Sequence, residues 1–272
     1  MRFQPKEPEE AINYSRESLV REAAVLLFAT GLAAAVLFLI LGEAIEFAVP
    51  RIPVRWEKPI FGTLARALDA DDTVIGGAAL DELARRIASR WPDNGYEFHV
   101  SIAENSMPNA FALPGGGIVV TRGLIEQSES ENELAFVLAH ELGHFHGRDH
   151  LRGFGRAAAF TLLSATLGAA TGMGVPDGLT LAQSLTQSGF SRAQESAADE
   201  FALDLVHREY GHLGGAFDFF RKDTAGEGGR MAVSWLSTHP SSDDRIERLE
   251  SLARQRGWGL DGAKRSAVRL NQ

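Results

Sequence analysis

The longest run of hydrophobic positions lies near the start of the chain. Residues 23–41 carry no charged side chain over 19 positions. As an α-helix this run would be about 29 Å long, close to the hydrocarbon thickness of a bilayer. The tail over 1–22 is both acidic and basic, and no clear small-residue cleavage site follows the run, which disfavours a cleaved signal peptide. The pattern predicts an uncleaved transmembrane anchor over 23–42.

Beyond a proline-containing connector over 43–75, hydrophobic positions recur with the period of a helix and then with that of strands. One face of a helix beginning near residue 78 is predicted to carry Leu80, Leu83, Ala84 and Ile87. Residues 96–102 alternate between apolar and polar side chains, as in a half-buried strand. Residues 111–121 predict two short strands around Gly115–Gly117.

Three further helices follow the predicted strands. Ser130 and Glu133 fit a capping box ahead of an apolar periodic run, so a helix is predicted to begin there. A second helix is predicted from Ser191 to just before Gly211, and a last one from near Ser242. The chain is therefore predicted to be α+β and mainly helical. Its domain over 76–272 would hold one small sheet and follow a single transmembrane helix.

Composition narrows the possible chemistry. The chain has no cysteine, which excludes disulfides, thiolate metal ligands and cysteine nucleophiles. Hydrophobic residues make up 44% and charged residues 23%, as in an ordinary folded protein. The formal net charge of −9 argues against a nucleic-acid partner, because such proteins usually present a basic surface.

The predicted helix after Ser130 contains the sequence HELGH at residues 140–144. Side chains four residues apart lie on one face of a helix, so His140 and His144 can bind one zinc ion. Glu141 projects from the same turn and can take a proton from a water molecule at the metal. A catalytic zinc needs a third protein ligand and one open position, so another residue must complete the site.

Two residues compete to be the third ligand. His150 completes the longer pattern H-E-x-x-H-x-x-G-x-x-H, which also needs a methionine turn that neither Met173 nor Met231 clearly provides. Glu195 lies on a separate predicted helix, with Asp199 four residues further on and on the same face. In that arrangement Asp199 would accept a hydrogen bond from the far nitrogen of a ligand histidine and fix its orientation.

Four blocks of sequence together resemble the M48 zinc metallopeptidases. They are HELGH, SRAQESAADEFAL at 191–203, NAFALPGGGIVVTRGLI at 109–125 and STHPSSDDRIERL at 237–249. The resemblance implies a zincin-like (gluzincin) protease domain with one zinc ion per chain. It implies that Glu195, not His150, joins His140 and His144 as a ligand. His146 and His150 would then be surface or helix-end neighbours.

The same resemblance implies roles for the other two blocks. Asn109, Ala110 and Phe111 would lie on an edge strand that binds an extended substrate main chain to main chain. His239 would lie near the zinc. Arg245 would either stabilise negative charge on the scissile carbonyl oxygen or position its helix.

The expected function is that of a membrane-anchored zinc endopeptidase. Its partners would be unfolded, membrane or envelope proteins as substrates, and the lipid bilayer through residues 23–42. The alternative is a membrane-tethered chaperone-like or binding module with a latent zinc site. Four basic residues before the anchor against three after it favour an extracytoplasmic or periplasmic domain, with the cytoplasmic side as the alternative.

A second uncharged run covers residues 157–175. A single span there would place His140 and Glu195 on opposite sides of the bilayer, so it is not predicted to cross the membrane. It is predicted instead to form a glycine-rich cover or membrane-facing flap over the cleft, within residues 157–187.

Overall fold

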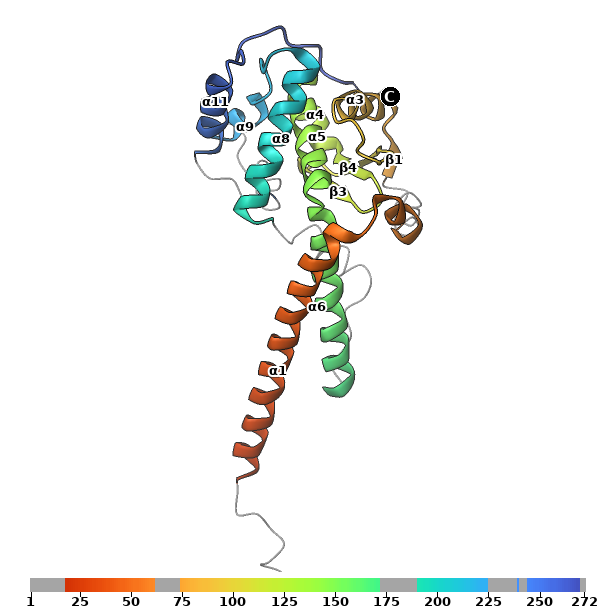
Figure 1. Ribbon diagram of the computed structural model, residues 1–272, viewed down its shortest axis with the longest axis vertical. Helices are drawn as coiled ribbons and strands as arrows, with labels where there is room; N and C mark the ends of the chain where they lie inside the picture. The colour runs from red at the N-terminus through yellow and green to blue at the C-terminus, as the bar shows by residue number, and fades with distance from the viewer. Residues whose placement is uncertain (1–17, 62–73, 172–189, 225–238, 240–243, 270–272) are drawn as a thin grey trace, which may run out of the picture.

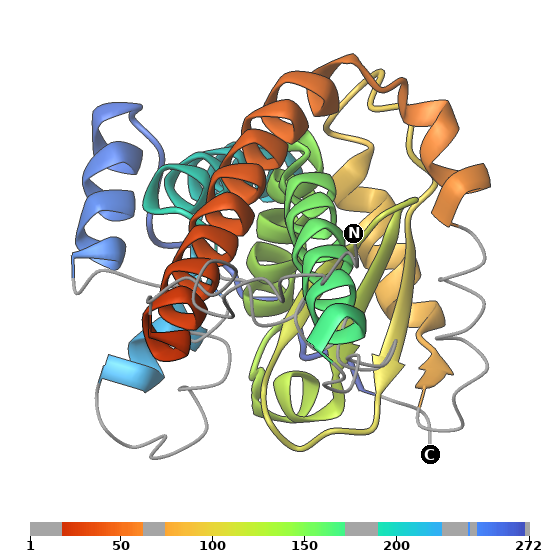
Figure 2. The same ribbon diagram turned by 90° about the horizontal axis from the view of Figure 1, so that it is seen from below.

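Two long helices project side by side from a domain of shorter helices and one small sheet (Figure 1; Figure 2). This computed structural model describes residues 18–61, 74–171, 190–224, 239 and 244–269. The first long helix, α1, spans Leu19–Ala48 and includes the predicted anchor. In the described part of the chain it is the one helix long and apolar enough to cross a membrane, and none of its residues is buried.

Two short 3₁₀ turns, η2 (Val49–Arg51) and η3 (Val54–Trp56), lead from α1 toward the domain. The sheet has the order β1-β2-β4-β3, with β2 and β4 parallel and the outer pairs antiparallel. Its strands are β1 (Val74–Gly76), β2 (His99–Ala103), β3 (Ala110–Leu113) and β4 (Gly117–Thr121). The predicted strand over 96–102 thus begins only at His99, because Tyr96 and Phe98 pack into an aromatic cluster with Trp91 instead.

The remaining helices are α3 (Ala78–Ala88), α4 (Arg122–Gln127), α5 (Glu131–Gly147), α6 (Asp149–Thr171), α8 (Arg192–Tyr210), α9 (Asp218–Thr224) and α11 (Arg245–Gln255). Helices α3, α4 and α5 contact the sheet, and the others lie further from it (Figure 1). Ser130 caps α5, and Ser191 forms a capping box with Gln194 at the start of α8. The predicted last helix begins at Arg245 rather than near Ser242, and residues 240–243 lie outside the described part.

Helix α5 forms the centre of the domain and packs closely on α8. Its residues 132–145 are all buried. At Gly143 a β-carbon would lie only 2.6 Å from the Cα of Ala198, a distance that real β-carbons essentially never show. The two backbones can approach this closely only because Gly143 has no side chain.

The described part of the second uncharged run, residues 157–171, continues helix α6 beside α1. Of the predicted glycine-rich cover or membrane-facing flap over 157–187, the described part is a helix that packs beside α1. Leucine and alanine dominate this stretch and it contains no proline, so nothing in it interrupts a helix. The rest of the run, from residue 172 onward, lies outside the described residues.

Glu57, in the predicted connector, is buried against the end of α5. Only 1% of it is exposed. Its carboxylate accepts hydrogen bonds from Tyr96 Oη at 2.7 Å and Arg148 Nη2 at 2.6 Å, and contacts His150 Nε2 at 2.9 Å. Arg148 adopts a left-handed conformation, with φ of 59°, where α5 ends and α6 is about to begin. One buried carboxylate thus joins the connector to the junction of two helices.

Replacing Glu57 with alanine should lower the free energy of unfolding by about 3 kcal/mol, because it leaves buried partners of the carboxylate uncompensated. Lys58→Ala is the matched control, since Lys58 pairs with Glu97 on the exposed surface, where ion pairs contribute little. Urea unfolding of the full chain in detergent, followed by tryptophan fluorescence, measures both variants. Equal stability of the two variants would contradict the role given to Glu57.

Candidate metal centre

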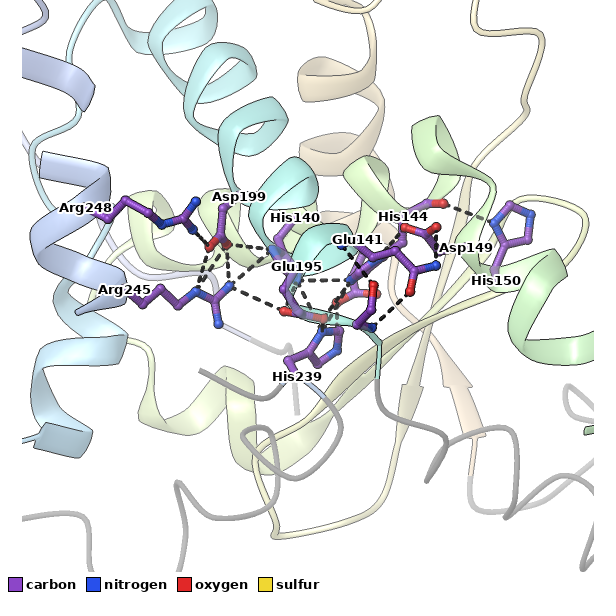
Figure 3. Close-up of polar contacts among 12 residues, drawn as sticks. His140, Glu141, His144, Asp149, His150, Glu195, Asp199, His239, Arg245 and Arg248 are labelled. Atoms are coloured by element: carbon purple, nitrogen blue, oxygen red, sulfur yellow. Dashed lines mark hydrogen bonds and ion pairs between the residues drawn. The ribbon is translucent and has the colours of Figure 1, made fainter. Parts of the chain in front are cut away.

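Four ligand-type side chains meet in the domain interior (Figure 3). Helix α5 presents His140 and His144, and α8 presents Glu195 from the facing side. The Nε2 atoms of the two histidines are 3.1 Å apart and lie 3.4 and 3.5 Å from the Glu195 carboxylate. His239 Nδ1 lies 3.1 Å from Glu195 and 3.2 Å from His140. One potential ligand atom from each residue falls within 4.8 Å of all the others.

Each helix histidine has a carboxylate behind it. Asp199 Oδ1 lies 3.0 Å from His140 Nδ1, as the i, i+4 spacing from Glu195 predicts. Asp149 Oδ2 lies 3.1 Å from His144 Nδ1. Asp149 also accepts a hydrogen bond of 2.6 Å from Gln194, on α8. Both imidazole rings are therefore fixed from behind by acceptors on neighbouring helices.

This arrangement fits a bound metal cation. A carboxylate can only accept a hydrogen bond, so each Nδ1 donates its proton and each Nε2 presents a lone pair to the centre. Two such lone pairs and the carboxylate of Glu195 would repel one another at these distances. A cation between them turns the repulsion into coordination, and buried charges are normally paired or coordinate metals.

Arg245 and Arg248 lie on the far side of Asp199. Arg245 Nε donates to Asp199 Oδ2 at 2.9 Å, and Arg248 Nη2 donates to the same oxygen at 2.8 Å. Burial alone would raise the pKa of Asp199, but the hydrogen bond with His140 and the charge of Arg245 outweigh it and lower the pKa. Of the two roles predicted for Arg245, these contacts favour the positioning of its helix over donation to a substrate.

Glu141 is fully buried beside the four ligand-type side chains. Its Oε1 lies 3.5 Å from His239 Nε2. Burial raises the pKa of Glu141 to about 7. A carboxylate with a pKa near neutrality can both accept and return a proton, which is what a general base at this position must do.

The predicted substrate-binding residues lie on or beside β3, an edge strand of the sheet. Among the described strands, its outer side has no partner. Thr121 fixes the start of the strand, since Asn109 N donates to Thr121 Oγ1 at 2.7 Å. Ala110 is fully buried and Phe111 is partly exposed. The main-chain atoms of this segment are therefore the ones suited to pair with an added strand. The backbone amide of Ala112, on the same strand, lies close enough to Glu141 to lower its pKa.

Of the two positions predicted for His150, at the surface or at the helix end, the structure shows the helix end. This residue is not at the surface: only 4% of it is exposed. Its Nε2 contacts Glu57, and its Nδ1 lies 3.4 Å from the carbonyl oxygen of His144, the helix-end contact that was expected. The ring is buried because the connector folds back over the end of α5. His146 is exposed, as predicted, and stacks on Phe201.

Sequence reasoning missed Asp149. It lies five residues after His144, a spacing that does not repeat on one face of a continuous helix. Only the left-handed turn at Arg148 brings its carboxylate back to the histidine. A helix end marked by Gly147 and followed by an acidic residue was the one available signal.

Comparisons with known proteins agree with this geometry. The sequence model of peptidase family M48 matches residues 78–253. Mitochondrial metalloendopeptidase OMA1 of Schizosaccharomyces pombe is 33% identical over 174 residues, covering 62% of this chain and 50% of the relative. Metalloprotease YcaL of Escherichia coli is 28% identical over 177 residues, covering 64% of this chain and 68% of the relative.

A further relative is the beta-barrel assembly-enhancing protease of Yersinia pestis, 27% identical over 188 residues, which cover 65% of this chain and 38% of that protein. The chain spans about half the length of the OMA1 relatives from two yeasts. The matched region contains the four ligand-type residues and both carboxylates behind the histidines. The chain therefore belongs to peptidase family M48.

Proposed function

We propose that the protein is a membrane-anchored, zinc-dependent endopeptidase. The observation that carries this is the convergence of His140, His144 and Glu195 beside the buried carboxylate of Glu141. A site that only stabilised the fold would not need a buried carboxylate beside the metal ligands in addition to them. This feature favours an enzyme over a latent binding module.

The distances between the ligand atoms fit a zinc ion. Bonds of about 2.0–2.1 Å in a tetrahedral arrangement place ligand atoms about 3.3 Å apart. The distances among His140, His144 and Glu195 are 3.1 to 3.5 Å. Two imidazoles and one carboxylate are also a ligand set found in catalytic zinc sites. We assign one zinc ion to these three residues, and His239 lies beside them.

The residues of the site would then have separate roles in hydrolysis. Zinc bound here would lower the pKa of a water molecule toward about 7 and polarise the scissile carbonyl. Glu141 takes the proton of the attacking water and returns it to the leaving nitrogen. Asp199 and Asp149 hold the ligand histidines in the required orientation. The free edge of β3 binds the substrate in an extended conformation, through the main chain at 109–111.

We further propose that the substrates are unfolded, membrane or envelope proteins, in a quality-control role. Helix α1 supports this, because it would tether the domain to a bilayer. The names of relatives point to metalloendopeptidases of mitochondria and to a protease that enhances β-barrel assembly. The slight excess of basic residues before the anchor supports an extracytoplasmic domain.

Glu141→Gln should abolish cleavage of an unfolded protein such as casein, with a loss of at least about 100-fold, because the amide cannot accept the proton of water. Metal content should stay at one ion per chain. The control is Glu126→Gln, the same change on the exposed surface of α4, which should cleave normally. Full activity of Glu141→Gln would exclude the proposed mechanism.

Glu195→Ala should lose bound zinc, whereas His150→Ala should retain it, because only Glu195 lies among the ligand atoms. Mass spectrometry of the native protein and metal analysis after dialysis both report the result. The opposite outcome, zinc retained without Glu195 and lost without His150, would favour the longer histidine motif.

Asp149→Asn should weaken zinc affinity by about 10- to 100-fold, the range found when the acceptor behind a ligand histidine is changed. Asp204→Asn is the control, since Asp204 lies on α8 but pairs only with Arg208 at the surface. Competition with a fluorescent chelator measures both affinities. Unchanged affinity in the Asp149 variant would show that His144 does not depend on this carboxylate.

A further inference from the structure

The second half of α6 is uncharged and carries exposed apolar side chains, although it belongs to a helix that begins inside the domain. Residues 157–171 contain no charged side chain. Phe160 and Leu162 are 56% and 66% exposed. On the facing helix α1, Leu39 is 67% exposed. Large apolar side chains that stay this exposed over two adjacent helices mark a surface that is covered by something other than water.

The two helices pack against each other away from the domain (Figure 1; Figure 2). Gly155 lies so close to α1 that a β-carbon there would contact the side chain of Ile45 at 3.1 Å. Further along, the rings of Phe38 and Phe160 meet edge to face with centroids 6.5 Å apart. Phe160 therefore lies level with Phe38, which is inside the uncharged run of α1.

A cluster of charges marks where this apolar pair of helices begins. Arg152 Nε lies 2.6 Å from Glu46, and Arg156 Nη1 lies 3.2 Å from the same carboxylate. Between these residues and residue 171, α6 carries no further charge, and α1 carries none from residue 23 to 42. Such a boundary between charged and apolar side chains is what the surface of a bilayer selects.

We propose that residues 157–171 of α6 insert into the lipid bilayer beside α1. This rests on the proposed anchoring by α1, because the bilayer that surrounds α1 would also contact the exposed side chains of α6. These fifteen helical residues are about 22 Å long, against roughly 30 Å of hydrocarbon, so the stretch is long enough to reach deep into the membrane. The lipid chains cover Phe160 and Leu162, and the Glu46–Arg152–Arg156 cluster lies at the headgroups.

Insertion of α6 would also fix the distance between the metal centre and the membrane. Helix α6 begins at Asp149, whose carboxylate is bonded to His144. His144 and Arg152, in the charge cluster, are thus separated by only eight positions along the chain. The substrates that fit such a site are polypeptide segments lying at the membrane surface, including those that adjoin a transmembrane helix.

The absence of cysteine allows a direct test by single-cysteine spin labelling. Leu162→Cys, Leu39→Cys and Gln255→Cys each place one label on the full chain, reconstituted in phosphatidylcholine–phosphatidylglycerol vesicles. Gln255, at the exposed end of α11, is the aqueous control. Molecular oxygen concentrates in lipid and a nickel chelate in water, so their relative collision rates with the label report its surroundings.

If α6 is inserted, the label should collide more often with oxygen than with the nickel chelate at both 162 and 39. At 255 it should collide more often with the nickel chelate. Nickel dominating at 162 while oxygen dominates at 39 would overturn the insertion of α6 but leave the anchor intact. Low rates for both reagents at 162 would show that protein covers this face, which also overturns the proposal. Nickel dominating at 39 would instead overturn the anchoring by α1 on which the proposal rests.

Discussion

The close approach of α5 and α8 at Gly143 and Ala198 is the constraint on which the metal centre depends. His140, Glu141 and His144 lie within one turn of Gly143, and Glu195 and Asp199 lie within one turn of Ala198. A contact at the middle of both motifs therefore sets the distances between the side chains that α5 and α8 bring to the cluster. Because the added β-carbon at Gly143 would meet Ala198 backbone atoms, no rotamer change can relieve the contact. A wider separation of the helices would withdraw the carboxylate from the histidines.

The second requirement is that the buried acids around the histidines remain charged. Asp199 is paired with the guanidinium groups of Arg245 and Arg248, brought by α11. Asp149 is held by Gln194 of α8 and by Arg152 of its own helix. Such partners hold the carboxylate oxygens in place to accept from the imidazole, because hydrogen bonds between charged groups are strong. Elements remote from the motif thus determine which nitrogen of each ligand ring faces the metal.

Local signals in the sequence predicted much of this structure. Capping residues at Ser130 and Ser191 located the two central helices, and helical spacing placed Asp199 behind His140. Asp149 was not predictable in this way, because the left-handed turn at Arg148 ends the periodicity on which such reasoning relies. Contacts between Glu57 and His150 join residues 93 positions apart, and nothing local specifies them. The path of α6 beside α1 was likewise set by packing between distant segments, not by its own composition.

The burial of Glu57 has a consequence for where the catalytic unit ends. The family resemblance and the composition both place the start of the domain near residue 76. If the domain began there, the preceding connector would be dispensable. In the structure, however, the connector carries a carboxylate that neutralises Arg148 and contacts His150, the two neighbours of Asp149. A domain separated from α1 by cutting the chain between residues 61 and 74 would lose this group unless the anchor fragment stayed bound. Separation from the α1 anchor and integrity of the end of α5 are therefore linked through one acidic side chain.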